Sequence, residues 1–175
     1  MNLENVAAVV TGGGSGLGRA TARALAQRGA RVGVIDLDEG AATAVASGID
    51  GLAIVCDVSD AESAASAVDQ VIEQFGVPRI LINCAGIGVA ARIVGRDGPH
   101  SLDLFANVIR VNLIGTFNLL RLVSAHMMTL EPITESGGRG VIVNTASVAA
   151  YEGPVSYTHL RAHETDSSLV CRLLL

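Results

Sequence analysis

The chain has 175 residues, 50% hydrophobic and 17% charged, with a formal net charge of -5 at pH 7. This composition predicts one globular domain with a sizeable core, and an acidic balance without basic runs argues against nucleic-acid binding. The first residues lack the regions of a signal peptide, and no uninterrupted apolar run reaches the ~18 residues of a membrane span, so we expect no membrane partner.

The cysteine and lysine content of the chain indicates the cellular compartment and limits the catalytic residues that are available. Cys56, Cys84 and Cys171 are scattered without metal-ligand spacing. They favour a reducing compartment, so we expect a cytoplasmic protein with no metal site. His159 and His163 have the spacing of helical ligands, but no third ligand accompanies them. All 12 lysine or arginine positions are arginine, so the chain contains no lysine.

Short apolar runs alternate with amphipathic segments along the chain. The predicted strands are residues 6–11, 31–36, 52–57, 79–83 and 141–145. Their apolar residues are continuous rather than alternating, as in strands that are covered on both faces. The pattern predicts an α/β fold, a Rossmann-like doubly wound parallel sheet with right-handed crossovers.

The predicted helices lie between these strands, at residues 16–29, 60–75 and 102–129. Ser59 and Glu62 have the spacing of a capping box at the start of the second helix. The third helix is apolar nearly all round, so we expect it to be buried. Residues 131–140 are predicted to form a loop.

A glycine-rich turn, TGGGSGLG at residues 11–18, lies between the first strand and the first helix. Glycine permits unusual backbone angles and lets a diphosphate approach the backbone, and the N–H groups at the helix start attract that diphosphate. The predicted cofactor-binding residues of this turn are Gly12, Ser15, Gly16, Leu17 and Gly18. The alternative is a turn with a structural role only.

Asp36 ends the second strand, at the place where a dinucleotide-binding fold carries an acid. A carboxylate there can accept hydrogen bonds from both hydroxyls of an adenosine ribose, and it repels a 2′-phosphate. We therefore expect NAD as the cofactor rather than NADP. The alternative is a surface aspartate without a ligand.

Two further motifs, CDV and NCAG, lie at the carboxyl ends of the third and fourth strands, which face the same crevice. Asp57, beside Val58, is predicted to accept from the adenine amino group, with a helix-entry role as the alternative. Small residues after the fourth strand leave room for the cofactor ribose. The remaining predicted cofactor-binding residues are Asn83, Cys84, Ala85 and Gly86, and Cys84 has the alternative of a small core residue.

These motifs, with NCAGI, VNLIGTFN and GVIVNTASVAAYEG, occur in an order that resembles the short-chain dehydrogenase/reductase family. They are most similar to its branch of type 2 3-hydroxyacyl-CoA dehydrogenases, over residues 5–154 of this chain. The resemblance implies hydride transfer between NAD(H) and a secondary alcohol or ketone, with an acyl-CoA as a candidate substrate. It also implies a homo-oligomer. A methyltransferase shares the glycine turn and the acid, but it would not require NCAG followed by a strand ending in serine.

By the same resemblance, Ser147 hydrogen-bonds the substrate oxygen, and Asn112 supports a water relay. From the residues alone, Ser147 has the alternative of a strand-end cap. Asn112 has the alternative of a helix-kink residue that satisfies a backbone group. Tyr151 is expected near the substrate pocket.

The family's catalytic tyrosine and lysine are missing from their expected positions, which hold Leu160 and Glu164. Tyr157 and Arg161 have the same mutual spacing, but they lie closer to Ser147. A guanidinium is a wide planar fork, whereas the family's chemistry needs a compact ammonium. We therefore expect this pair to be inactive.

The composition changes near Pro154, because all 20 glycines precede it. The residues after it fit no part of the family and resemble translated sequencing-adapter read-through. We interpret residues 1–154 as an NAD-binding domain whose sheet is incomplete at its C-terminal side, and residues 155–175 as an artefactual tail. We therefore expect that the chain belongs to an oxidoreductase family but is itself inactive. The alternative is a non-catalytic NAD-binding module.

Overall fold

The computed structural model describes residues 2–89, 91–96 and 98–147 of the chain. Their core is a parallel five-stranded sheet with the order β3-β2-β1-β4-β7. The strands are β1 (Ala7–Thr11), β2 (Arg31–Asp36), β3 (Leu52–Val55), β4 (Ile80–Asn83) and β7 (Val141–Asn144). This order confirms the predicted Rossmann-like, doubly wound α/β fold. In the described part of the chain, β7 forms the outer edge of the sheet beside β4.

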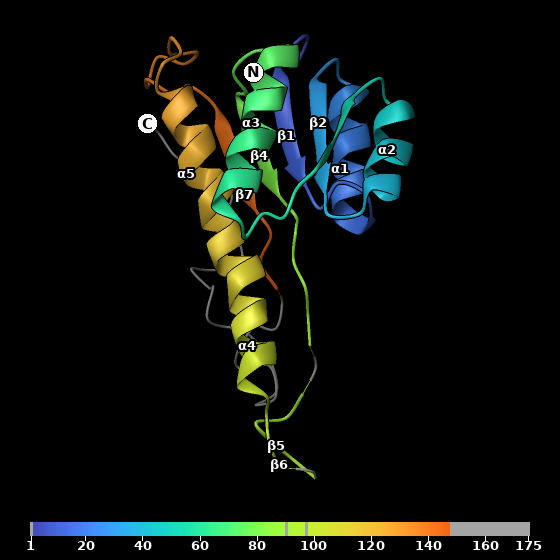
Figure 1. The fold of residues 1–175 in the computed structure, drawn as a ribbon. Coiled ribbons are helices and arrows are strands. Elements are labelled where there is room, and N and C mark those ends of the chain that lie inside the picture. Colours follow the sequence, from blue (N-terminus) through green and yellow to red (C-terminus); the bar gives the residue numbers. More distant parts are fainter. Residues whose placement is uncertain (1, 90, 97, 148–175) are drawn as a thin grey trace.

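Helices cover both faces of the sheet (Figure 1). On one face lie α1 (Gly16–Ala26) and α2 (Glu39–Ser47), and on the other lie α3 (Ala61–Phe75) and α5 (Thr116–Met127). Each helix returns the chain to the start of a parallel strand. The carboxyl ends of all the strands therefore meet at one edge of the sheet.

The two covered faces explain why the strands are apolar without alternation. In β1, Ala8 and Val10 join the core cluster under α1 and α2, whereas Val9 joins the cluster under α3 and α5. Successive side chains of a strand point to opposite faces of the sheet, and here helices cover each face. Of the residues of β1, only the last, Thr11, places a polar side chain in this interior.

α2 is absent from the predicted elements. Its nine residues are mostly small, and its buried side is formed by Ala42, Val45 and Ala46. A stripe made mainly of alanine carries little contrast in hydropathy, so the helical period is weak. The signal that does mark this helix is its N-cap, Asp38, whose carboxylate accepts a hydrogen bond from the N–H of Ala41 at 2.9 Å.

α3 forms as predicted, but its cap differs from the expected one. The N-cap is Asp60, whose carboxylate accepts from the N–H of Ser63 at 2.7 Å. The predicted capping box of Ser59 and Glu62 is therefore wrong. Ser59 lies before the cap, and its hydroxyl donates to the Asp57 carboxylate at 2.7 Å.

The predicted helix 102–129 forms as one continuous helical segment of three parts. α4 (Leu102–Ile109) leads into η1 (Arg110–Gly115), a π-helical stretch, and then into α5. A π-helical stretch inside an α-helix is rare and occurs frequently at functional sites. Its position therefore makes η1 a place to look for functional contacts.

The expectation that this whole segment is buried is wrong. α5 packs on the sheet through Leu119 and Val123, which are fully buried, but Leu102 is 77% exposed and Phe117 is 59% exposed. α4 extends beyond the end of the sheet (Figure 1). By length and composition, Leu102–Met127 is the one helix among the described residues that could cross a membrane, although core helices of soluble proteins meet the same criteria.

Two short segments complete the fold. The hairpin of β5 (Val94–Gly95) and β6 (Gly98–Pro99) lies at the far end of the α4 extension (Figure 1). Residues 131–140 form the predicted loop, which Arg79 anchors by donating to the carbonyl oxygens of Glu131 at 3.1 Å and Arg139 at 2.7 Å. Because Arg79 immediately precedes β4, this loop lies at the amino end of the strand, away from the carboxyl edge.

Candidate functional site

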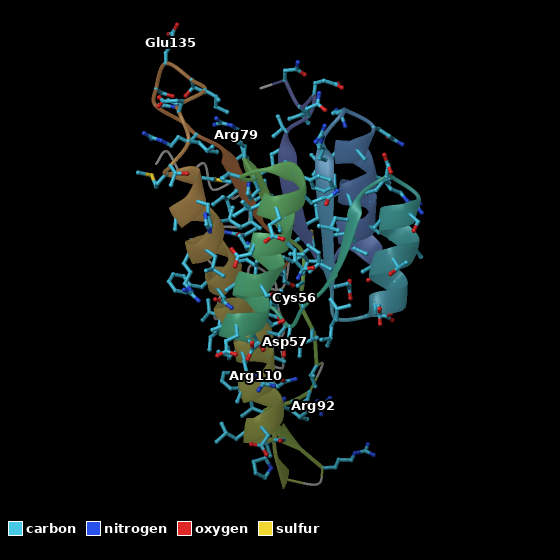
Figure 2. The ribbon with its side chains drawn as sticks, turned by 45° about the horizontal axis from the view of Figure 1, so that its top comes forward. Cys56, Asp57, Arg79, Arg92, Arg110 and Glu135 are labelled. Atoms are coloured by element: carbon cyan, nitrogen blue, oxygen red, sulfur yellow. The ribbon has the colours of Figure 1, made fainter. Side chains whose placement is uncertain are left out.

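The candidate site lies where the carboxyl ends of the strands meet. Thr11, Asp36, Asn83 and Asn144 end β1, β2, β4 and β7. The strand order reverses between β1 and β4, and ligands of open α/β sheets bind in the crevice at such a point. Figure 2 shows Asp57 and Arg110 near each other, well below Arg79 and Glu135, which lie toward the top of the view.

The glycine turn lies at this edge of the sheet, between the end of β1 and the start of α1. Gly12 has a φ of 61°, and a Cβ atom there would lie 2.8 Å from the backbone nitrogen of Ala85. A Cβ atom at Gly18 would overlap the carbonyl oxygen of Gly12. Gly16 has a φ of 47°, yet a Cβ atom there would meet no atom within 4 Å. The turn is therefore packed tightly against the protein on one side and open on the other, as a diphosphate cradle requires.

The start of α1 faces the open side of this turn. Its N-cap is Ser15, whose side chain makes no capping hydrogen bond, and its first turn contains no acidic residue. The first N–H groups of a helix lack partners within the helix and attract anions. Leu17 in the same turn is 69% exposed. The arrangement fits the predicted role of Ser15, Gly16 and Leu17 beside a phosphate.

Asp36 is fixed in place by the backbone around it. One carboxylate oxygen accepts from the N–H of Gly14 at 2.9 Å, and the other accepts from the N–H of Asp38 at 3.1 Å. Each oxygen has two lone pairs, so each retains acceptor capacity for a ligand hydroxyl. The bond from Gly14 ties the acid directly to the glycine turn, which the sequence alone does not indicate.

Thr11 joins the two strands on which the crevice is built. Its side chain is 1% exposed, and its hydroxyl oxygen accepts from the N–H groups of Cys84 and Ala85, both at 3.1 Å. These bonds hold the segment after β4 against the end of β1. Thr11 was not among the predicted site residues, although it is the only polar residue of its strand.

Asn83 and Cys84 face the interior more than the crevice. The Asn83 side chain is 3% exposed, and its amide nitrogen donates to the side-chain oxygen of Asn144 at 2.9 Å. It thereby bridges β4 and β7. Burial raises the pKa of the Cys84 thiol, so the thiol is protonated at neutral pH. The structure supports the alternative of Cys84 as a small, partly buried residue.

Asp57 is an ionised acceptor at the edge of the crevice. Its carboxylate accepts from the hydroxyl of Ser59 at 2.7 Å and from the N–H of Ser59 at 2.9 Å. The Ser59 hydroxyl first, then its N–H, together with the positive charge of Arg110, hold the pKa of the Asp57 carboxyl below its usual range. The N–H of Asp57 donates to the Ser63 hydroxyl of α3 at 3.1 Å. Asp57 thus has helix-entry contacts and also a charge available to a ligand.

Of the predicted cofactor-binding residues, Val58 has a buried side chain, whereas Gly86 is exposed. The Val58 side chain is 7% exposed and belongs to the core cluster under α3 and α5, so only its backbone can face a ligand. Gly86 is exposed, and a Cβ atom there would lie 3.4 Å from the side-chain oxygen of Asn112. Gly86 therefore allows the chain after β4 to pass close to the long helix.

Asn112 lies in η1 and binds the backbone of the segment after β4. Its side-chain oxygen accepts from the N–H of Ile87, and its amide nitrogen donates to the carbonyl oxygen of Ile87, both at 2.9 Å. This two-bond pairing is the backbone-satisfying role that the sequence left open for Asn112. It fixes the wall of the crevice beside Gly86, and the predicted water relay stays a prediction.

Ser147 is half-buried and follows the carboxyl end of β7, on the crevice side of the sheet. Tyr151, expected near the substrate pocket, and the pair Tyr157 and Arg161 lie outside the described residues, as do Leu160 and Glu164 at the positions of the family's tyrosine and lysine. So do Cys171, His159 and His163. Within the described ranges, no group of three or more potential metal ligands occurs.

Comparison with known proteins connects this site to a family. A profile described as short chain dehydrogenase matches residues 6–160. The 3-hydroxyacyl-CoA dehydrogenase type-2 of Bos taurus is 42% identical over 158 residues, which make up 88% of this chain and 60% of that protein. The protein of the same name from Homo sapiens is 41% identical over the same shares. The chain thus spans 60% of the length of these relatives.

A crystal structure from Brucella melitensis 16M, named as ribose-5-phosphate isomerase, shares the fold. Its TM-score is 0.79 at 34% sequence identity, covering 93% of this chain and 59% of the other. Its name specifies a different activity from that of the relatives above. The likeness therefore supports the architecture, and the choice between activities depends on the site.

The role of Thr11 can be tested by Thr11→Val, which keeps the shape of the side chain but removes the acceptor. The N–H of Ala85 then lacks its partner, so the free energy of unfolding should fall by about 1–3 kcal/mol. Urea unfolding followed by circular dichroism measures this change. The matched control, Thr43→Val on the exposed side of α2, should change it by less than about 0.5 kcal/mol. Equal small effects of both substitutions would contradict the role of Thr11.

The environment of Asp57 predicts a pH effect. Its folded pKa lies below the ordinary value of about 3.9, so ionised Asp57 stabilises the fold above that pH. This contribution disappears as the pH falls toward the folded pKa. Ser59→Ala removes the largest cause and should raise the pKa of Asp57, as measured by NMR titration of its carboxyl carbon. Ser66→Ala, an exposed serine of α3, is the control, and an unchanged Asp57 midpoint in Ser59→Ala would overturn this explanation.

Proposed function

Because the chain belongs to the short-chain dehydrogenase family, we propose that the described residues form the NAD(H)-binding part of an oxidoreductase. The single observation that carries the proposal is the glycine turn with Asp36 bonded to Gly14 inside it. A bound nicotinamide cofactor would supply or accept the hydride. The residues of this chain bind and orient it.

The turn is shaped for a dinucleotide. The positive φ of Gly12 and Gly16 and the close packing at Gly18 leave the backbone exposed on the crevice side, next to the uncapped start of α1. A diphosphate there would accept from the helix N–H groups. The segment from Ala85 to Gly86, held by Thr11 and Asn112, would pass beside the second ribose.

Asp36 is the basis for proposing NAD(H) rather than NADP(H). Its two backbone hydrogen bonds hold the carboxylate at the end of β2, where it can accept from the ribose hydroxyls. A 2′-phosphate at the same place would bring two negative charges together. Such repulsion in a partly buried site favours the cofactor that lacks the phosphate.

The substrate proposal is a secondary alcohol or ketone, with 3-hydroxyacyl-CoA as the class named for the relatives. Ser147, after β7, would donate a hydrogen bond to the reacting oxygen. The 175 residues contain no lysine, so this polypeptide by itself lacks the amine that the family pairs with its catalytic tyrosine. That absence favours, as a second candidate, an NAD-binding module without turnover. We do not propose the isomerase activity, because the fixed carboxylate of Asp36 at the end of β2 is suited to accept hydrogen bonds from the ribose hydroxyls of a dinucleotide.

Compartment and assembly complete the proposal. Cys56 and Cys84 are free, and burial raises the pKa of the Cys56 thiol, which keeps it protonated and unreactive. Free, buried thiols are typical of a reducing compartment, so we propose a cytoplasmic location. The exposed apolar side chains of α4 and α5, such as Leu102 and Phe117, are consistent with the homo-oligomer that the family resemblance implies.

Cofactor preference can be measured by isothermal titration with NAD⁺ and NADP⁺. The unmodified chain should bind NAD⁺ more tightly by about tenfold or more, which is ~1.4 kcal/mol. Asp36→Ala should weaken NAD⁺ binding and remove this discrimination. Asp69→Ala on the exposed face of α3 makes the same change in net charge and should preserve it. Equal affinity of the unmodified chain for both cofactors would contradict the assignment of Asp36.

Turnover by the 175-residue polypeptide should be undetectable with 3-hydroxyacyl-CoA or simple secondary alcohols and NAD⁺. General acid–base help is typically worth about 10²–10⁴-fold, and here both the proton-transfer residue and its pKa-tuning partner are missing. A chain in which a family-like continuation follows Pro154, with a tyrosine at position 160 and a lysine at position 164, should gain activity. Activity of the unmodified chain, read from NADH absorbance, would contradict this account, and its loss in Tyr157→Phe would identify Tyr157 as the working acid.

A further inference from the structure

We propose that Asn118 of α5 is a positioning residue for the adenine side of the crevice, acting through Ser59 on the Asp57 carboxylate. The inference rests on the proposed NAD(H) binding and deepens it. It adds α5, the helix that directly follows the π-helical stretch carrying Asn112. Three sets of contacts support it.

The first set is made by the Asn118 amide. Its side chain is 5% exposed, and its nitrogen donates to the carbonyl oxygens of Val58 at 3.0 Å and Asp60 at 3.1 Å. These two carbonyls belong to the residues immediately before and after Ser59. A single buried amide therefore holds the peptide group that precedes Ser59 and the one that follows Asp60.

The second set connects Ser59 to the ligand-facing charge. Both the hydroxyl and the N–H of Ser59 donate to the same carboxylate oxygen of Asp57, Oδ1, at 2.7 and 2.9 Å. Oδ1 is thereby held by the loop, and in the proposed complex Oδ2 accepts the hydrogen bond from the ligand. Because Ser59 is held by Asn118, the direction of Oδ2 depends on α5. Figure 2 shows Asp57 beside Arg110 of the same long helical segment.

The third set is the packing between the loop and the helix backbone. A Cβ atom at Gly115 would lie 2.6 Å from Cγ2 of Val58, so the loop contacts the helix where it has no side chain. The orientation of the amide is also fixed, because its oxygen accepts from Arg121 Nε at 3.0 Å and from a terminal guanidinium nitrogen at 2.7 Å. With the oxygen paired to a cation, the nitrogen must point at the two carbonyls.

The long helix therefore holds both walls of the crevice. Asn112 in η1 pairs with the backbone of Ile87 beside Gly86, on the side proposed for the nicotinamide ribose. Asn118 pairs with the loop on the side proposed for adenine. Asn112 lies inside the π-helical stretch and Asn118 follows it in α5, so one continuous helical segment carries both amides.

The test uses the adenine amino group as the probe. Nicotinamide hypoxanthine dinucleotide differs from NAD⁺ by having an oxygen in place of that amino group, so it cannot donate to Asp57. The unmodified chain should bind NAD⁺ about tenfold or more tightly than this analogue, since a hydrogen bond to a charged group is involved. In Asn118→Ala the ratio should fall to about threefold or less. Any general loss of stability would weaken both ligands equally and leave the ratio unchanged.

Ser124→Ala is the matched control on the same helix, because the Ser124 hydroxyl is buried and has no hydrogen-bond partner among the described residues. Its ratio should equal that of the unmodified chain. A ratio retained in Asn118→Ala, or lost equally in Ser124→Ala, would overturn the role of Asn118 while NAD⁺ binding stands. Absence of saturable NAD⁺ binding by the unmodified chain would overturn the proposed function and this inference together.

Hydrogen exchange of the unmodified chain gives a second measurement that does not depend on whether Asn118→Ala folds. Adenosine monophosphate should slow exchange both in the segment around residues 56–62 and in that around 113–121. Protection confined to residues 56–62 would show that the loop is not coupled to α5, and the proposal would fail.

Discussion

The close packing of the glycine turn against its neighbours is the constraint on which the rest of this structure depends. A side-chain carbon at Gly18 would overlap the carbonyl oxygen of Gly12, and one at Gly12 would lie 2.8 Å from the nitrogen of Ala85. The end of β1, the start of α1 and the segment after β4 can therefore meet at one place. Without that approach, the strand ends would still align, but no cradle for an anion would form between them.

Around this turn, single polar side chains, two of them buried and one half-buried, hold the parts of the crevice. Thr11 binds the segment after β4, Asn112 binds Ile87, and Asn118 binds the loop after β3. Each of these residues holds its loop through bonds to backbone groups, and Asn118 also pairs its side-chain oxygen with Arg121. Such contacts fix loops that carry no regular structure of their own, and they leave the charged groups, Asp36 and Asp57, free to meet a ligand.

The sequence allowed prediction of the sheet because its physical cause is local. Each strand is a short apolar run, and the glycine turn and Asp36 have fixed places relative to β1 and β2. The errors arose where the outcome depends on tertiary contacts. The apolar pattern of residues 102–129 is real, yet α4 extends beyond the sheet, and Leu102 is exposed. α2 was overlooked because its buried stripe is mostly alanine.

The site was predicted as a set of positions but not as a network. Asp36, Asp57 and the glycines lie at the crevice as expected, whereas Val58 turns its side chain into the core and Asn83 bridges two strands. Thr11 and Asn118 lie in stretches of sequence whose patterns are those of an ordinary strand and an ordinary helix. Nothing in their neighbours in sequence shows that their partners lie more than fifty residues away.

The most direct test of the central claim, that this crevice binds NAD(H), is an NMR titration of the isotope-labelled chain with NAD⁺. Saturable shifts should appear at the amides of Gly12 to Gly18, at Asp36, and at Ala85 and Gly86. The loop of residues 131–140, anchored by Arg79 at the other end of the sheet, should be unaffected. Shifts confined to that loop, or no saturable shifts at the glycine turn, would contradict the account.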